Sequence, residues 1–309
     1  MTTTTVAART ALSARGLTKR YGTELALDEV TFDIPEHAIC GLFGRNGAGK
    51  TTLMSILTAQ NFATSGHGFT YGESAYENPR VLSRMCFVRE GQTYPEDSVP
   101  AHAFQMARLF FPRWDQDLAD ELVDEFRLPV GTRIKKLSRG QLSAVGVIIG
   151  LASRAEITFF DEPYLGLDAV ARQSFYDRLI EDYTAHPRTI LLSSHLIDEV
   201  SDLIERVLVL DAGRLVLDAT ADDLRGTAFT VVGPESRVDA VIGDREELHR
   251  ERLGSVASAT VLGTLSDADQ AALTAAGLST APVALQELIV RLTRRAADRP
   301  AGTPKGAQR

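Results

Sequence analysis

Cysteine is scarce in this sequence. Only Cys40 and Cys86 occur among 309 residues, and they are 46 positions apart in the sequence. Two thiols are too few for a disulfide framework or a cysteine-rich zinc site, and such scarcity is typical of a reducing cytoplasm. Five of the six histidines also show no paired spacing of the kind that metal ligands use. The sequence therefore excludes a disulfide-stapled scaffold and a structural zinc domain.

Long apolar runs and an excess of basic residues are also missing. The longest apolar run covers about residues 144–152, whereas a membrane-spanning helix needs about 20 residues. The first 15 residues have no continuous apolar core, so we expect no secretory signal. Lys and Arg number 33 against 41 Asp and Glu, a net charge of −8. Because proteins that coat nucleic acid present a basic face, the acidic balance argues against a nucleic-acid partner.

The overall composition, with 44% hydrophobic and 24% charged residues, is typical of a globular protein. The length suits one large domain or two ordinary ones. Residues 226–309 contain ten acidic and ten basic groups, so the net charge of −8 belongs to residues 1–225. This shift predicts a first domain over 1–225 and a small module over 226–309. The last part of that module, residues 291–309, forms a basic tail.

Short apolar runs alternate with helical patterns along the first domain. Such runs between helices indicate buried strands of a mostly parallel sheet, so we predict an α/β fold. Residues 101–111 and 115–126 have helical patterns, which predicts a helical insertion over about 95–155. Residues 211–214 read as a hairpin turn. The predicted strands cover 38–43, 157–160, 189–193 and 207–210.

The second domain reads as a small α+β module. Residues 229–232 and 256–262 have the pattern of strands, and residues 267–276 and 283–296 have the pattern of helices.

A glycine-rich loop follows the first predicted strand and opens a helix. It matches the pattern G-x-x-x-x-G-K-[ST], which requires this context. Its glycines let consecutive N–H groups turn towards phosphate oxygens, and the helix N-terminus adds its positive end. Lys50 would reach the β- and γ-phosphates, and the Thr51 hydroxyl would ligate Mg²⁺. The predicted ATP-binding residues are Gly44, Arg45, Asn46, Gly47, Ala48, Gly49, Lys50, Thr51 and Thr52.

Two carboxylates, Asp161 and Glu162, follow the predicted strand 157–160. Ligands of parallel sheets gather at the carboxyl ends of the strands. Asp161 is therefore a candidate Mg²⁺ ligand, and Glu162 could orient or deprotonate an attacking water. An acidic loop after a buried strand is also common without any function, so the assignment depends on the phosphate loop.

With these residues in place, the chain resembles the ATP-binding subunit of ABC transporters over about residues 13–225. Further segments agree in the family's order. Residues 158–172 and 195–200 are similar to the YtrB-like branch of bacterial exporter cassettes. The matching positions are Tyr21, expected just before the first strands, for adenine stacking; the Q-loop, 87–92; the signature peptide, Leu137, Ser138, Arg139, Gly140 and Gln141; Asp168 of the D-loop; and His195 as the switch histidine.

The resemblance implies an ATPase that uses ATP and Mg²⁺. Two cassettes, as a homodimer or a heterodimer, would sandwich two ATP molecules, each touching the phosphate loop of one subunit and the signature of the other. Ser138 would donate to the γ-phosphate across that interface, and it also suits an ordinary helix N-cap. His195 would sense the γ-phosphate. The chain would act at the cytoplasmic face of the membrane, held there by a separate integral membrane permease.

The sequence departs from the family at two places. The family has a Q-loop glutamine, which helps to ligate Mg²⁺, where this chain has Glu90, with Gln92 two residues later. Both remain candidate ligands, and Glu90 is nearer the family's position. The signature has Arg139 where the family usually has glycine. Its guanidinium could reach a phosphate or a neighbouring carboxylate.

Other function classes fit less well. DNA-acting ABC proteins place long coiled coils between the phosphate loop and the signature, but the segment from Lys50 to Ser138 contains no sustained heptads. Translation-linked members carry two cassettes in one chain. P-loop kinases and G-domain proteins lack the signature peptide and the switch histidine. A non-transport ABC ATPase and an importer cassette stay as alternatives to an exporter.

Overall fold

The computed structural model describes residues 9–298 of the chain. The chain divides into two compact units, Met1–Asp218 and Ala219–Arg309. The division falls slightly before the boundary that the charge distribution suggests at residue 225. Three residues of the expected basic tail, Arg299, Lys305 and Arg309, lie outside the described residues.

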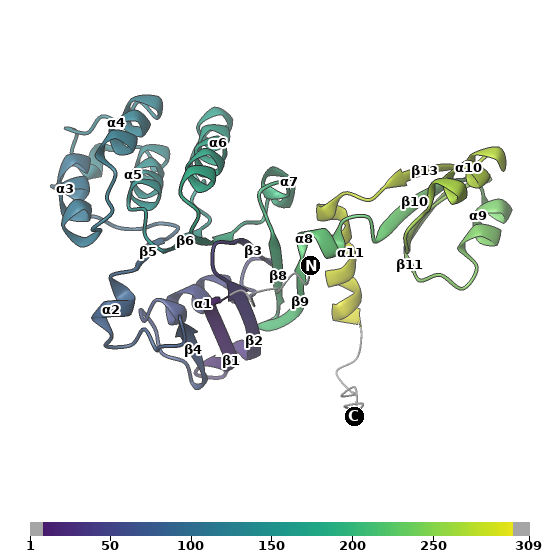
Figure 1. The fold of residues 1–309 in the computed structure, drawn as a ribbon, viewed down its shortest axis with the longest axis horizontal. Coiled ribbons are helices and arrows are strands. Elements are labelled where there is room, and N and C mark those ends of the chain that lie inside the picture. Colours follow the sequence, from purple (N-terminus) through teal and green to yellow (C-terminus); the bar gives the residue numbers. More distant parts are fainter. Residues whose placement is uncertain (1–8, 299–309) are drawn as a thin grey trace, which may run out of the picture. The chain divides into compact units, whose positions relative to one another are not determined.

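A six-stranded sheet forms the centre of the first unit (Figure 1). Its first five strands pair in parallel, and β8 and β9 form the hairpin at the predicted turn. The α/β prediction is therefore confirmed, and every residue of β3, β6 and β7 is buried. In order across the sheet, the strands are β5 (Met85–Val88), β6 (Ile157–Asp161), β7 (Thr189–Ser193), β3 (Ile39–Phe43), β8 (Arg206–Asp211) and β9 (Arg214–Thr220).

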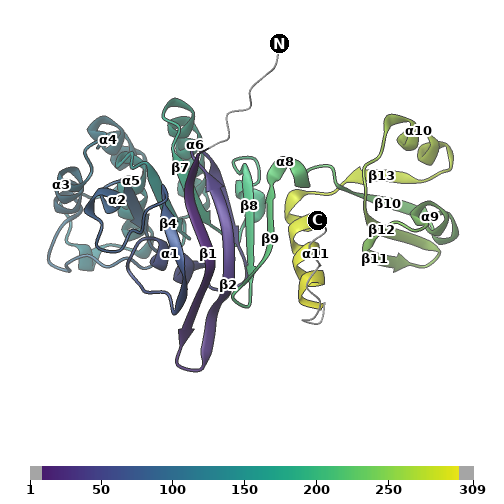
Figure 2. The ribbon, with the colours of Figure 1, turned by 60° about the horizontal axis from the view of Figure 1, so that its bottom comes forward.

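A second, antiparallel sheet has the order β2 (Glu24–Pro35), β1 (Thr10–Tyr21) and β4 (Ser65–Thr70) (Figure 2). The expected position of Tyr21 just before the first strands is wrong. Tyr21 is the last residue of β1 and pairs with Glu24 across the turn into β2. The ring of Tyr21 therefore lies at the tip of a hairpin. The prediction was wrong because the sequence pattern did not reveal the first two strands.

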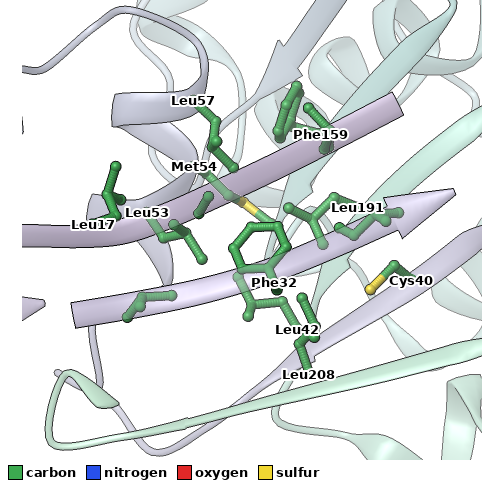
Figure 3. Close-up of a cluster of buried hydrophobic side chains, with 14 of the residues drawn as sticks. Leu17, Phe32, Cys40, Leu42, Leu53, Met54, Leu57, Phe159, Leu191 and Leu208 are labelled. Atoms are coloured by element: carbon green, nitrogen blue, oxygen red, sulfur yellow. The ribbon is translucent and has the colours of Figure 1, made fainter. Parts of the chain in front are cut away.

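The helix α1 (Lys50–Leu57) packs between the two sheets of this unit. Its apolar residues meet side chains from both sheets in one buried cluster (Figure 3). Burying a leucine or phenylalanine contributes about 1.5–3 kcal/mol each, so this cluster fixes the helix firmly. The N-terminus of α1, where the phosphate loop ends, is thereby held at the carboxyl ends of the parallel strands. The cluster includes Leu17, Phe32, Leu42, Leu53, Met54, Leu57, Phe159, Leu191 and Leu208.

Helices occupy the segment predicted as a helical insertion. There α3 and α4 pack on α5, and α5 also contacts β5 and β6. Asp115 caps α4, and Ser138 caps α5 in a capping box with Gln141. No helix in the described part of the chain is long and apolar enough to span a bilayer. The helices of this unit are α2 (Pro79–Leu82), α3 (Pro100–Phe110), α4 (Gln116–Glu125), η1 (Ile134–Lys136), α5 (Arg139–Ala152), α6 (Ala169–Ala185) and α7 (Ile197–Val200).

The second unit contains a four-stranded antiparallel sheet of order β11-β12-β10-β13. With α9 and α10 placed between its strands in the sequence, this is a split β-α-β-β-α-β arrangement. Its core joins apolar residues of β10 and β12 to those of α9, among them Val231, Val238 and Val261. The elements are α8 (Ala221–Leu224), β10 (Ala228–Pro234), α9 (Glu235–Ile242), β11 (Glu247–Leu253), β12 (Val256–Leu262), α10 (Asp267–Ala275), β13 (Ser279–Pro282) and α11 (Leu285–Asp298).

The sequence predicted β10, β12, α10 and α11 in this unit but missed α8, α9, β11 and β13. The strand β11 lies at an edge of the sheet and is largely exposed, so it lacks an apolar pattern. Its Arg250 instead forms ion pairs with Asp239 and Glu247. The strand β13 is only four residues long and ends in a proline.

Candidate active site

The phosphate loop runs from the end of β3 to the start of α1. Gly44, Gly47 and Gly49 have φ values of 150°, 80° and 106°, a region that favours glycine. A Cβ at Gly44 would lie 2.3 Å from the carbonyl oxygen of Leu210, and one at Gly49 would lie 2.5 Å from that of Ala26. Both glycines are therefore required, for their backbone angles and for their close packing.

Lys50 is the first residue of α1, and its side chain is buried. Its Nζ donates to the carbonyl oxygen of Gly44 at 2.8 Å and lies 3.4 Å from that of Arg45. The same ammonium lies 3.5 Å from Oε1 of Glu162, whose side chain is also buried. The lysine thus joins the phosphate loop to the acidic end of β6.

Polar side chains meet where β6 and β7 end beside α1. The Thr51 hydroxyl donates to Oδ2 of Asp161 at 2.6 Å. The Ser193 hydroxyl donates to Oδ1 of the same carboxylate at 2.7 Å and accepts the backbone N–H of Glu162 at 3.0 Å. The structure therefore brings together Thr51 and Asp161, two of the four residues predicted as Mg²⁺ ligands, and adds Ser193, to which the sequence assigned no role.

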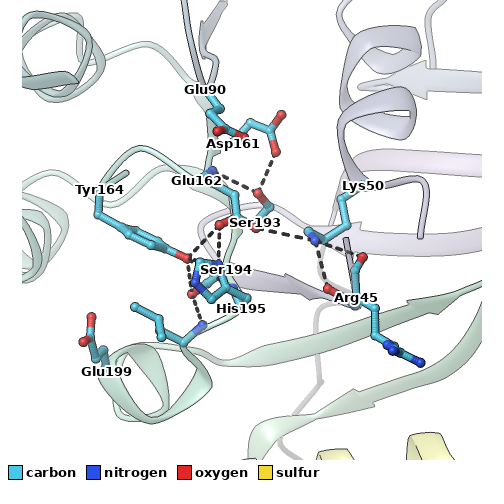
Figure 4. Close-up of polar contacts among 12 residues, drawn as sticks. Arg45, Lys50, Glu90, Asp161, Glu162, Tyr164, Ser193, Ser194, His195 and Glu199 are labelled. Carbon is cyan, nitrogen blue, oxygen red and sulfur yellow. Dashed lines mark hydrogen bonds and ion pairs between the residues drawn. The ribbon is translucent and has the colours of Figure 1, made fainter. Parts of the chain in front are cut away.

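Glu162 lies directly after β6 with φ 48°, in the left-handed region that non-glycine residues rarely adopt. Its Oε2 accepts from Nδ1 of His195 at 2.5 Å and from the hydroxyl of Tyr164 at 3.1 Å (Figure 4). Strained backbone of this kind persists only where surrounding contacts hold it. Here Ser193, Tyr164 and His195 supply those contacts.

The nucleotide-sized pocket next to the loop has a volume of about 440 Å³. Tyr21 lines it with 46% of its surface exposed, and its hydroxyl accepts from the side-chain amide of Asn61. His195 lines a neighbouring pocket together with loop residues Arg45 to Ala48. The residues that line the first pocket are Tyr21, Glu24, Ala26, Asn46, Gly47, Ala48, Gly49, Lys50, Thr51, Thr52, Glu90, Asp161 and Glu162.

The signature residues 137–141 do not line this pocket within the single chain. The Ser138 hydroxyl accepts from the N–H of Gln141 at 3.2 Å as the N-cap of α5. A Cβ at Gly140 would lie 2.4 Å from the carbonyl oxygen of Gly166, so the signature packs directly on the loop before Asp168. Asp168 itself caps α6 by accepting from the N–H of Ala171 at 2.8 Å.

The two departures from the family pattern meet in space. Arg139 donates to Oε1 of Glu90 at 3.2 Å, so its guanidinium reaches a carboxylate, one of the two options that the sequence left open. This pair is exposed, and such pairs contribute about 0–1 kcal/mol. Glu90 lines both the nucleotide pocket and a small cavity beside Arg139, whereas Gln92 lines that cavity but not the nucleotide pocket.

Sequence reasoning missed Ser193, Ser194 and Tyr164 as members of the site. Ser193 and Ser194 precede His195 at the end of a buried strand, a position that could have signalled polar partners for the carboxylates. Tyr164 carried no such signal, because a tyrosine after an acidic loop is compatible with ordinary packing.

The comparisons with known proteins agree with this geometry. A family model described as ABC transporter matches residues 27–165. The chain is 30% identical over 246 residues to the daunorubicin resistance ATP-binding protein DrrA2 of Streptomyces coeruleorubidus, covering 78% of this chain and 74% of that protein. It is 25% identical over 214 residues to the ABC transporter ATP-binding protein YtrB of Bacillus subtilis (strain 168), covering 69% and 73%.

Solved structures share the fold. The ATP-binding subunit of an ABC transporter superposes with a TM-score of 0.62 at 23% identity, covering 70% of this chain and 92% of that one. A dimeric bacterial ABC transporter cassette gives 0.61 at 20% identity, covering 68% and 98%. Because a relative at 30% identity matches over most of both chains, this chain belongs to the ABC transporter ATP-binding proteins, the ATPase subunits of ATP-driven transporters.

Proposed function

We propose that this chain closes with a second cassette around two molecules of ATP and Mg²⁺, and that hydrolysis drives a separate membrane permease. One observation carries the proposal: Lys50, Thr51, Asp161 and Glu162 line one pocket, while the signature lies outside it. The γ-phosphate side of that pocket is therefore incomplete in a single chain. A signature from a second cassette, either an identical copy or a related one, would complete it.

Each residue of the pocket has a role in this proposal. The Lys50 ammonium would neutralise phosphate charge, and the loop N–H groups would hold the phosphate oxygens. The Thr51 hydroxyl and the Asp161 carboxylate, 2.6 Å apart, offer the oxygen donors that Mg²⁺ prefers. Bound Mg²⁺ would neutralise charge that develops on the phosphates. Glu162 would take a proton from the attacking water, and His195 would contact the γ-phosphate.

We also propose that the transporter exports a small molecule. The permease would hold this chain at the cytoplasmic face of the membrane. The name of one relative supports this direction, since DrrA2 is a daunorubicin resistance ATP-binding protein. The accessory second unit would support assembly with the permease rather than catalysis, since every residue lining the nucleotide pocket belongs to the first unit. Co-purification of the full chain with an integral membrane protein, and drug efflux from cells that express both, would test direction and partner.

The sandwich predicts nucleotide-driven dimerisation. Glu162→Gln with saturating ATP is expected to elute as a dimer in size-exclusion chromatography, because bound and unhydrolysed ATP bridges the two subunits. Ser138→Arg in the same background is expected to remain monomeric, since a large side chain would block the contact in trans. If the Glu162→Gln protein is saturated with ATP yet forms neither a homodimer nor a heterodimer with a related cassette, the proposed sandwich is wrong.

The pocket geometry predicts that Glu90 matters more than Gln92 for Mg²⁺. Glu90→Ala is expected to raise the Mg²⁺ concentration for half-maximal ATPase activity by severalfold, and Gln92→Ala to change it little. Arg139→Ala provides a control, because it removes the partner of Glu90 but leaves the carboxylate. A Mg²⁺ titration with the opposite ranking would transfer the role to Gln92.

A further inference from the structure

Tyr164 lies in the loop between β6 and α6, and its side chain is almost fully buried, with 2% of the residue exposed. Its hydroxyl lies 3.1 Å from Oε2 of Glu162, 3.0 Å from Oγ of Ser194 and 3.2 Å from Nδ1 of His195. The backbone N–H of His195 also donates to it at 3.1 Å. In Figure 4 this oxygen is the point where contacts from both strand ends converge.

The donors and acceptors around this hydroxyl can be assigned. A phenol has one proton to donate and two lone pairs. One lone pair accepts the N–H of His195, and the proton goes to the Glu162 carboxylate, the strongest acceptor within reach. Ser194 accepts the N–H of Leu196 at 2.8 Å, so its own proton can serve the second lone pair of Tyr164.

This assignment fixes the imidazole as well. Nδ1 of His195 lies 2.5 Å from Oε2 of Glu162 and must carry a proton to make that hydrogen bond. Oε2 of Glu162 is then occupied by Tyr164 and His195 together. Oε1, which lies 3.5 Å from Lys50, remains for a water in the nucleotide pocket that Glu162 lines.

The tyrosine ring has little freedom to move. It packs against the His195 ring at a centroid distance of 5.7 Å and against the Tyr176 ring at 6.3 Å. Tyr176 in turn packs in a tilted arrangement against Phe175, with ring centroids 5.1 Å apart. Burial also raises the pKa of the Tyr164 hydroxyl, so that it stays protonated and keeps donating.

We propose that Tyr164 is a positioning residue for ATP hydrolysis. Its hydroxyl holds the Glu162 carboxylate and the His195 imidazole in one arrangement, with Oε1 left for the attacking water and His195 kept beside the phosphate loop. Tyr164 does not line the nucleotide pocket, so it acts through these two side chains and not on ATP itself. Misplacement of a catalytic group by about 1 Å is enough to cost much of the rate.

Tyr164→Phe tests the proposal, because it keeps the ring and its packing and removes only the oxygen. We expect kcat for ATP to fall by about tenfold or more while KM stays within twofold. Tyr183→Phe is the matched control. It removes a hydroxyl that lies within hydrogen-bonding distance of the carbonyl oxygen of His37 and of Oε1 of Glu205 in the same unit, and it should leave kcat unchanged.

A purely structural role for Tyr164 predicts a different pattern, in which the thermal midpoint falls and kcat per folded molecule matches the Tyr183→Phe protein. That result would overturn the proposal. The double variant Tyr164→Phe with Glu162→Gln supplies a second readout. If the hydroxyl acts largely through the carboxylate, the double variant should lose much less than the product of the two single losses, whereas independent effects would multiply.

Should Tyr164→Phe fail to fold, Ser194→Ala removes a polar partner of the same hydroxyl. It is expected to lower kcat severalfold with KM unchanged. Unchanged kcat in that variant would contradict the proposal.

Discussion

Replacing Glu162 with glutamine is expected to lower the rate of ATP hydrolysis by about 10²- to 10⁴-fold while ATP binding is retained. Glutamine keeps the shape of the side chain, and its carbonyl oxygen can still accept from Tyr164 and His195. It cannot take a proton from water. Because Glu162 lines the nucleotide pocket and its Oε1 lies 3.5 Å from Nζ of Lys50, the loss is expected to fall on the chemical step.

Single-turnover hydrolysis and a nucleotide-binding titration on the same protein would separate the two effects. Glu156→Gln is the matched control, since Glu156 directly precedes β6 and pairs with Arg84 and Arg113 instead of the pocket. It should hydrolyse ATP at the wild-type rate per folded molecule. Wild-type turnover in Glu162→Gln itself would remove Glu162 from the role of general base.

The parallel sheet was predictable because its strands are buried on both faces. Residues 189–193 read as a continuous apolar run in the sequence and form β7 over the same residues. The runs at 157–160 and 207–210 became β6 and β8 with one added residue at one or both ends. Such strands need no alternation, so a short apolar run between helices is sufficient evidence.

The antiparallel strands β1 and β2 were not located in advance, and their irregularity explains why. The pairing of β1 with β2 shifts register at several points, between Ala14 and Leu17 among others. Each shift breaks the alternation of buried and exposed residues by which half-buried strands are recognised. The expected place of Tyr21 was wrong for the same reason.

The residues of the site also fall into two groups: those in contiguous sequence motifs, and those that only the fold brings into contact. The phosphate loop and the pair Asp161 and Glu162 are contiguous motifs, so their residue types and spacing could be read directly. The contact of Arg139 with Glu90 joins residues 49 positions apart. The contacts of Tyr164 with Ser194 and His195 depend on β6 and β7 lying side by side. No local pattern contains that information.

Lys50→Ala is expected to weaken ATP binding by about 10- to 100-fold and to reduce hydrolysis at saturating ATP as well. The ammonium is the cation of the phosphate loop, and charge-assisted hydrogen bonds to phosphate are among the stronger ones. In the protein alone it donates to the Gly44 carbonyl, so the side chain already lies across the loop that would hold the phosphates. Its removal therefore affects ground-state binding and the transition state together, unlike the Glu162 change.

The control for Lys50→Ala is Lys135→Ala, which removes one positive charge from an exposed pair with Asp97. Such a surface pair contributes little, so affinity for ATP should stay within twofold of the wild type. Calorimetric titration of ATP into both proteins would compare them, with thermal unfolding to show that each is folded. The buried Glu162 loses its nearby cation in Lys50→Ala, so some loss of stability is expected. A folded Lys50→Ala protein that binds ATP as tightly as the wild type would show that the phosphates bind elsewhere.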